Sequence, residues 1–107
     1  MVNEFGVTLD SNGYAPSIIQ GYMGNCFECG RCDQKLDRHE VFHGPYRPKA
    51  KRQGLWVMLC HERCHLNGAH KNADIDRELK EIGQKRAMVA YGWSVDDFRK
   101  EYGKNYL

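Results

Sequence analysis

The pattern of apolar and polar residues predicts a hairpin in the middle of the chain. Leu36 to Phe42 is strand-like and stops at Gly44-Pro45, and Leu55 to Leu59 is an aromatic and aliphatic run that suits a buried strand. The segment between them, from Pro45 to Gln53, is basic, contains two prolines and is expected to be a loop. Two strands joined in this way favour an antiparallel hairpin.

Helical spacing predicts two helices in the C-terminal third. The segment from Asp74 to Tyr91 is amphipathic, because its apolar residues recur on one helix face: Ile75, Leu79, Ile82 and Val89. Gly83 is unfavourable inside such a helix, and Gly92 is a typical residue to end it. Ser94 with Asp97 three residues later is typical of a helix N-terminal cap, which predicts a second helix from Ser94 to Tyr102.

The remaining N-terminal segment has no regular period. Residues 1–25 are rich in glycine and are expected to form an irregular arm around a single α+β domain, residues 26–107. A chain of 107 residues with 41% hydrophobic residues fits one domain. Because so small a domain has a limited core, many chains of this size add a metal ion or disulfides.

The charge is informative only in its distribution. The net charge of +2 is too small to indicate a nucleic-acid partner, but no acidic residue lies between Glu40 and Glu62. Taken alone, the basic residues of this region indicate a solvated loop, and they become candidate DNA contacts only beside a reactive site. These candidates are Arg47, Lys49, Lys51 and Arg52, together with Arg38, which lies just before the interval.

Nothing in the sequence indicates secretion or a membrane span. The N-terminus lacks a basic start and an apolar stretch, and the longest apolar run, Leu55 to Cys60, is too short to cross a bilayer. The expected location is therefore a reducing cytoplasm, where clustered cysteines bind metal more often than they form disulfides. The cysteine count, 5, is also odd.

Four of the cysteines have the spacing of a structural zinc site. Cys26 and Cys29 form a Cys-x2-Cys pair followed by a glycine, and Cys60 and Cys64 form a second pair beyond the hairpin. An alternative register pairs Cys29 with Cys32, which is otherwise a spare thiol. A closed site of four thiolates stabilises a fold and catalyses nothing.

Histidines near the second cysteine pair predict another, open metal position. If Cys64 begins a helix, His65 points about 100° away from it and toward the hairpin, where His39 lies near the end of the first predicted strand. Hydrolysis of a phosphodiester needs a base and a cation, which such a site supplies. Two alternatives stay open: His65 as a zinc ligand paired with Cys60, and His70 as a loop residue. His43 and His61 are expected at the surface or around the site.

The order of these motifs resembles small HNH-superfamily endonucleases of phages and prophages. The resemblance runs from about Asn12 onward and rests on the series Cys26-Phe-Glu-Cys29-Gly30, Arg38-His39-Glu40-Val41-Phe42, Gly54-Leu55-Trp56-Val57-x-Leu59-Cys60, Cys64-His65, Gly68-Ala-His70 and Tyr102-Gly103-Lys104-Asn105-Tyr106-Leu107. It implies a ββα-metal (His-Me finger) fold, in which a hairpin and a helix clasp one catalytic cation beside a structural zinc ion.

The resemblance also implies roles for particular residues. His39 becomes the general base, His65 a helix ligand of the catalytic ion, and His70 a further ligand or a phosphate contact. Glu40 stands where the superfamily often has a histidine and is a third catalytic candidate beside His39 and His65. Whether His39 or Glu40 contacts the metal is left open, because adjacent strand residues face opposite ways.

The expected function is therefore metal-dependent DNA cleavage. The implied cofactors are a structural Zn²⁺ ion and a catalytic Mg²⁺, Mn²⁺ or other divalent ion, and the implied partners are DNA and phage or host recombination or packaging proteins. One alternative is a non-catalytic zinc module that binds DNA or a protein. Another is a nuclease-like phage accessory that acts only with a host partner. The sequence does not indicate the oligomeric state.

Overall fold

The two predicted strands form an antiparallel hairpin in the computed structural model, which describes residues 1–31 and 35–107. Strand β1 (Leu36–Glu40) pairs with β2 (Trp56–Cys60), and His39 lies opposite Val57. Strand β1 is shorter than predicted because Val41 and Phe42 turn into the core, where both are buried. Helices complete the fold, so the predicted α+β class is confirmed.

The segment between the strands is helical, and the prediction of a loop there is wrong. A 3-10 turn, η1 (Gly44–Tyr46), leads into a short helix, α1 (Arg47–Arg52), and each has a proline in its first turn. Proline is compatible with that position because the first amides of a helix have no partner within the helix. Helix α1 is held in place by Ala50, which is completely buried in the core.

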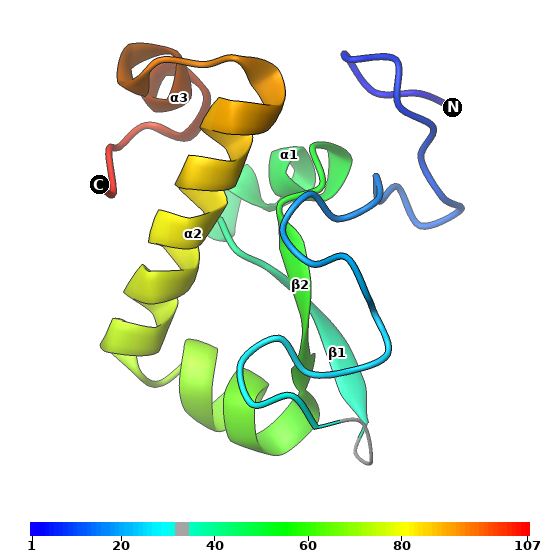
Figure 1. The fold of residues 1–107 in the computed structure, drawn as a ribbon, viewed down its shortest axis with the longest axis vertical. Coiled ribbons are helices and arrows are strands. Elements are labelled where there is room, and N and C mark those ends of the chain that lie inside the picture. Colours follow the sequence, from blue (N-terminus) through cyan, green and yellow to red (C-terminus); the bar gives the residue numbers. More distant parts are fainter. Residues whose placement is uncertain (32–34) are drawn as a thin grey trace.

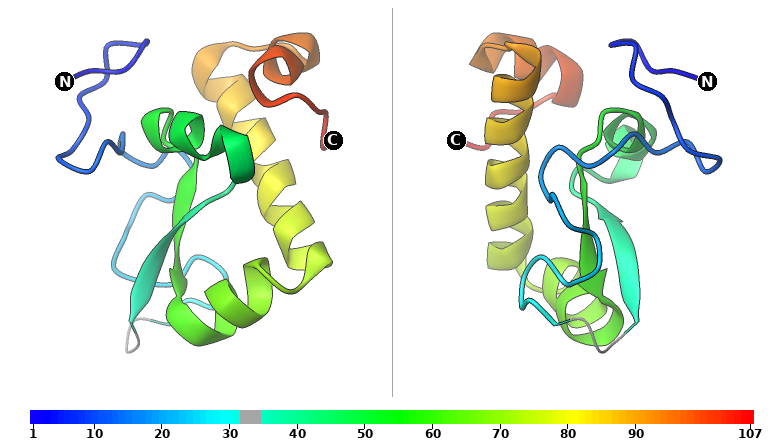
Figure 2. Two further views of the ribbon diagram at one scale, coloured as in Figure 1. Left: turned by 180° about the vertical axis from the view of Figure 1, so that it is seen from behind. Right: turned by 45° about the vertical axis from the view of Figure 1, so that its right-hand side comes forward.

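Three helical segments follow β2 (Figures 1 and 2). The first, η2 (His61–Ala69), has wide π-type turns, and it is followed by α2 (Ala73–Tyr91) and α3 (Val95–Tyr102). The predicted capping box between Ser94 and Asp97 is confirmed, as is the end of α2 at Gly92. Of the helices in the described part of the chain, none combines the length and apolar character needed to cross a membrane.

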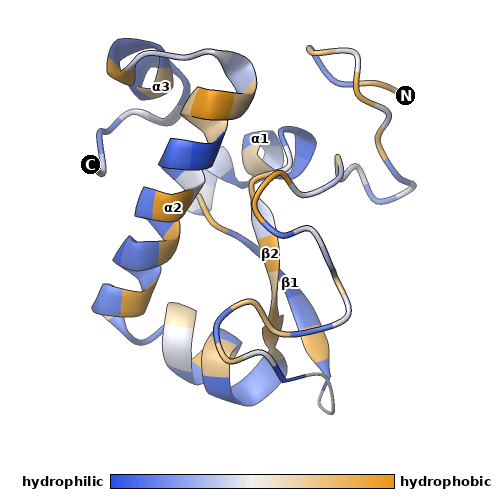
Figure 3. Ribbon diagram, in the orientation of Figure 1, coloured by the Kyte–Doolittle hydropathy of each residue, from blue (hydrophilic) through white to orange (hydrophobic). Residues whose placement is uncertain are grey.

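Helix α2 packs on the hairpin through small residues. A Cβ atom at Gly83 would lie 3.1 Å from side-chain atoms of Val41 and of Phe42, so glycine permits this close approach. The placement of Val89 on the apolar face is wrong, because its exposed fraction is 84%. The buried face runs through Leu79, Gly83 and Ala87, and Val89 lies about 200° around the axis from Ala87. Figure 3 shows both hydrophobic and hydrophilic positions on this helix.

The N-terminal arm, residues 1–25, runs beside the hairpin (Figure 1), and its Phe5 ring stacks on Tyr91 at the end of α2 with ring centroids 4.0 Å apart. The arm contains no helix or strand apart from an isolated bridge between Val2 and Thr8. It is tied to the hairpin by hydrogen bonds from the Ile18 amide to the Gly54 carbonyl, at 2.9 Å, and from the Ser17 hydroxyl to the Trp56 carbonyl, at 2.6 Å. These contacts cover backbone groups at the outer edge of the hairpin, which could otherwise form hydrogen bonds with a strand of another chain.

Candidate metal centres

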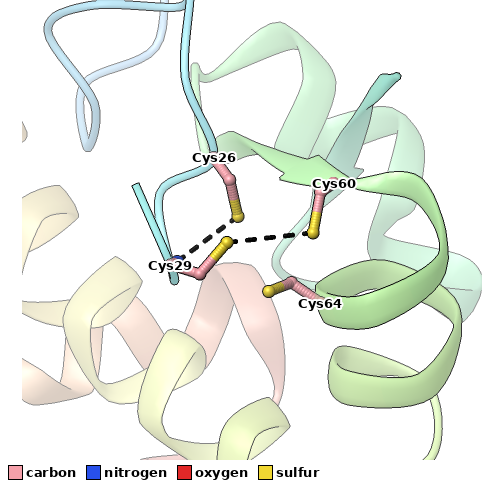
Figure 4. A group of neighbouring side chains, drawn as sticks. All are labelled: Cys26, Cys29, Cys60 and Cys64. Carbon is pink, nitrogen blue, oxygen red and sulfur yellow. Dashed lines mark hydrogen bonds between the residues drawn. The ribbon is translucent and has the colours of Figure 1, made fainter. Parts of the chain in front are cut away.

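Four cysteine side chains converge where the start of β1 meets the end of β2. The sulfur atoms of Cys26, Cys29, Cys60 and Cys64 all lie within 4.8 Å of one another (Figure 4). The Sγ atoms of Cys29 and Cys60 are 3.9 Å apart. Zinc–sulfur bonds of about 2.3 Å in a tetrahedron separate the sulfurs by about 3.8 Å, so the spacing fits zinc. The four cysteines thus form a cluster that can bind a metal ion such as zinc.

The electrostatics of the cysteine cluster favour a bound cation. Although burial raises the pKa of Cys26, backbone hydrogen bonds around its sulfur lower it to about 7, and the Cys29 amide donates to this atom at 3.4 Å. Burial and the neighbouring thiols raise the pKa of Cys64. All four side chains can therefore be thiolates together only when a positive charge lies among them. The predicted spare thiol, Cys32, lies outside the described residues.

The wide turns of η2 explain how one segment serves two clusters. The His70 amide donates to the His65 carbonyl at 3.1 Å, five residues back, which is a π-type bond. In so wide a helix, residues four apart point in nearly the same direction. Cys60 and Cys64 therefore face the other cysteines, whereas the next pair along the chain, His61 and His65, faces Asp37 of β1.

Three histidines form the second cluster. Donor nitrogens of His39, His65 and His70 all lie within 4.8 Å of one another, and the Nε2 atoms of His65 and His70 are 2.9 Å apart. The structure thus brings these three predicted site residues together, and His65 belongs to this cluster rather than to the cysteine cluster. Two nitrogen ligands of one ion at bonds of about 2.1 Å are about 3 Å apart, so these side chains fit a metal ion.

His39 is the most enclosed member of the histidine cluster. Its side chain is 2% exposed, and its buried Nε2 atom has no hydrogen-bond partner among the described residues. Burial, together with the charges of His65, His70 and His43, lowers the pKa of His39 to about 3. The ring is therefore neutral at pH 7, and it makes T-shaped contacts with the imidazole rings of His65 and His70.

Asp37 positions the histidine cluster, a role that the sequence analysis missed. Its Oδ2 atom is 2.9 Å from Nδ1 of His65, which leaves Nε2 of His65 free to face His70. Burial alone would raise the pKa of Asp37, but its hydrogen bonds with His61 and His65 lower it, so Asp37 stays ionised. Strand alternation was the available signal, since residues 37 and 39 share one face of β1.

Glu40 and the predicted DNA contacts are not members of the histidine cluster and are engaged within the chain. Glu40 is not part of the histidine cluster; its carboxylate is 3.4 Å from Nε of Arg47. The other four predicted contacts have an acidic or aromatic partner each: Arg38 pairs with Asp10, Lys49 with Glu101 and Arg52 with Glu4, and Lys51 lies over the ring of Tyr14. Only part of their charge is therefore available to a ligand.

Arg47 lies within electrostatic reach of the histidine cluster. Burial lowers the pKa of His70, and the charges of His65, His43 and Arg47 lower it further.

The chain matches no protein-family model, no curated protein and no solved structure. Its two clusters therefore have to be interpreted from their own chemistry.

Proposed function

We propose that the chain is a metal-dependent DNA endonuclease of the HNH type, with a divalent ion held by His39, His65 and His70. The observation that carries this proposal is the convergence of donor nitrogens from His39, His65 and His70, together with a buried Nε2 atom of His39 that has no hydrogen-bond partner among the described residues. Leaving such a buried atom unpaired costs about 1–3 kcal/mol of folding free energy, and a histidine with a purely structural role would gain nothing in return. A bound cation would satisfy this atom.

The local architecture supports the same reading. The histidines come from β1 and from the helical segment that follows β2 directly, which is the order expected for a ββα-metal site. A cluster of four cysteines at the start of that segment supplies the stabilising element that a small catalytic domain needs. Neither His39 nor His70 is required by the cysteine cluster, whose four ligands are complete without them.

The geometry favours His39 as a ligand rather than as the general base expected from the resemblance. A base works best when its pKa is near the working pH and when it can reach water, whereas His39 is 2% exposed and its pKa is about 3. A neutral imidazole with a free lone pair is a suitable ligand.

When bound, a divalent ion supplies Lewis acidity to a phosphate oxygen. Arg47, whose side chain is 56% exposed, is the predicted DNA contact we place nearest to that phosphate.

A plasmid-cleavage assay tests the proposal. We expect the natural chain, loaded with zinc, to nick or cut supercoiled DNA when Mg²⁺ or Mn²⁺ is added. His65→Ala is expected to lower the rate at least about 100-fold, because it removes a ligand that Asp37 holds in place. Gel densitometry gives the rate, while circular dichroism and zinc analysis show whether the variant still folds.

The matched control is His61→Ala. His61 also binds Asp37, but it is not part of the histidine cluster, so its loss is expected to change the rate by less than about tenfold. Equal cleavage by the natural chain and His65→Ala would indicate a contaminating nuclease and contradict the proposal. A folded natural chain that never cleaves DNA would favour the non-catalytic zinc module instead.

Substitution of Asp37 should weaken the divalent site without emptying the cysteine cluster. Asp37→Asn removes the charge that holds His65, and such substitutions next to a metal ligand typically cost about 10- to 100-fold in affinity. Calorimetric titration of the zinc-loaded protein with Mn²⁺ measures the change. Asp10→Asn alters the ion pair with Arg38 and the hydrogen bonds that Asp10 accepts from the Asn12 and Tyr14 amides, but no contact of the histidine cluster, so this variant should bind Mn²⁺ like the natural chain. Equal affinities for all three proteins would contradict this role of Asp37.

A further inference from the structure

A second histidine–carboxylate pair lies beside the histidine cluster. His43 follows β1, Asp76 lies in the first turn of α2, and Nε2 of His43 is 3.1 Å from Oδ1 of Asp76. The ring centroids of His43 and His39 are 6.4 Å apart. This pair is therefore adjacent to the proposed divalent site, although neither residue had a role in the sequence analysis.

The two residues share an open pocket with a member of the histidine cluster. A pocket of about 240 Å³ is lined by His43, Asp76 and His70, together with Ala69, Lys71, Asn72 and Ala73. The side chain of His43 is 39% exposed, so it can meet water and a substrate, as buried His39 cannot. The pocket thus places a solvent-accessible imidazole within reach of anything held at His70.

Asp76 is held by a second partner, and its carboxylate determines which ring nitrogen of His43 carries the proton. Its second oxygen, Oδ2, is 2.9 Å from Nζ of Lys80. Burial alone would raise the pKa of Asp76, but its hydrogen bonds with Lys80 and His43 lower it, so the carboxylate is ionised. An ionised carboxylate accepts a hydrogen bond from Nε2–H of His43, which leaves the lone pair of Nδ1 available as a proton acceptor.

We propose that His43, oriented by Asp76, is the general base of the proposed hydrolysis; this inference rests on the proposed function. The attacking water gives its oxygen to phosphorus and its proton to Nδ1 of His43. The bond between phosphorus and the departing sugar oxygen breaks, its electron pair leaves with that oxygen, and the oxygen takes a proton from solvent. His43 then returns its proton to solvent. Asp76 acts through His43 and is a positioning residue.

The test compares His43→Ala with the natural chain at saturating Mn²⁺. General-base catalysis contributes about 10²- to 10⁴-fold, so we expect kcat to fall by that factor while KM and the affinity for Mn²⁺ stay within about twofold. Added imidazole is expected to restore part of the lost rate, because the truncated side chain opens the pocket to a small base. Asp76→Asn should lower kcat less than His43→Ala and should gain nothing from imidazole.

His61→Ala is again the matched control, since His61 is also 39% exposed and paired with an aspartate but does not line this pocket. Imidazole should not accelerate that variant. If the natural chain cleaves DNA, His65→Ala does not, and His43→Ala retains full kcat, the proposed function stands and this inference fails. If His43→Ala loses activity together with Mn²⁺ affinity and imidazole restores nothing, His43 supports the metal site and is not the base, which also overturns the inference.

Discussion

Cys60→Ser is expected to unfold the domain at 25 °C. Cys60 is completely buried, ends β2 and lies opposite Leu36 of β1, so its ligand position joins the hairpin to η2. Binding of a structural zinc ion to small domains contributes about 10–16 kcal/mol, whereas the net stability of a domain is only about 5–15 kcal/mol. Far-UV circular dichroism, thermal unfolding and zinc stoichiometry measure the result. A strong chelator added to the natural chain should reproduce it.

Cys32→Ser provides the comparison for this experiment. The sequence leaves Cys32 as the spare thiol, so its replacement is expected to keep one zinc ion per chain and an unchanged unfolding midpoint. Loss of zinc in Cys32→Ser with retention in Cys26→Ser would show that the alternative cysteine register is correct. A folded, zinc-free Cys60→Ser protein would show that the cysteine cluster is dispensable for the fold.

Gly54→Ala is the second substitution with a large expected effect. Gly54 has a φ of +75°, and a Cβ atom there would lie 2.4 Å from the backbone oxygen of Pro16. The left-handed conformation costs a non-glycine residue about 1–2 kcal/mol, and displacing the arm adds about 1–3 kcal/mol. We therefore expect a loss of about 2–5 kcal/mol in the free energy of unfolding, measured by denaturant titration of the zinc-loaded protein.

Gly92→Ala separates the two contributions. Gly92 has a φ of +67°, but a Cβ atom there would meet nothing within 4 Å. This variant should therefore lose only the conformational part, about 1–2 kcal/mol. If Gly54→Ala and Gly92→Ala are equally destabilised, the packing of the arm against the hairpin does not contribute to stability as described.

The fold was predictable where one local signal dominated. The capping box at Ser94 and the buried run in β2 produced the expected helix and strand. The segment of α1 was misread because prolines and basic residues are typical of loops, and the buried position of Ala50 is visible only in three dimensions. Val89 was misplaced because side-chain hydrophobicity pointed to it, whereas the close approach at Gly83 decides which face of α2 is buried.

The candidate site shows the same division between local and distant information. The spacing of Cys26, Cys29, Cys60 and Cys64 predicted the cysteine cluster, and the structure brings these residues together. His39, His65 and His70 were also named from sequence, and their donor atoms do converge. The pairing of His43 with Asp76 was not predictable, because these residues meet only through the packing of α2 beside the end of β1.

The direct succession of Cys64 and His65 in η2 has a consequence for the order of assembly. Until sulfur ligands anchor this stretch, its imidazoles are held to β1 only through the hydrogen bonds of His61 and His65 with Asp37, so we expect them to capture an ion only weakly. We therefore expect the two proposed sites to fill in one order, with the ion of the cysteine cluster entering first and the ion of the proposed divalent site second. An excess of a thiol-seeking metal that displaces the first ion would then disable the second site without ever occupying it.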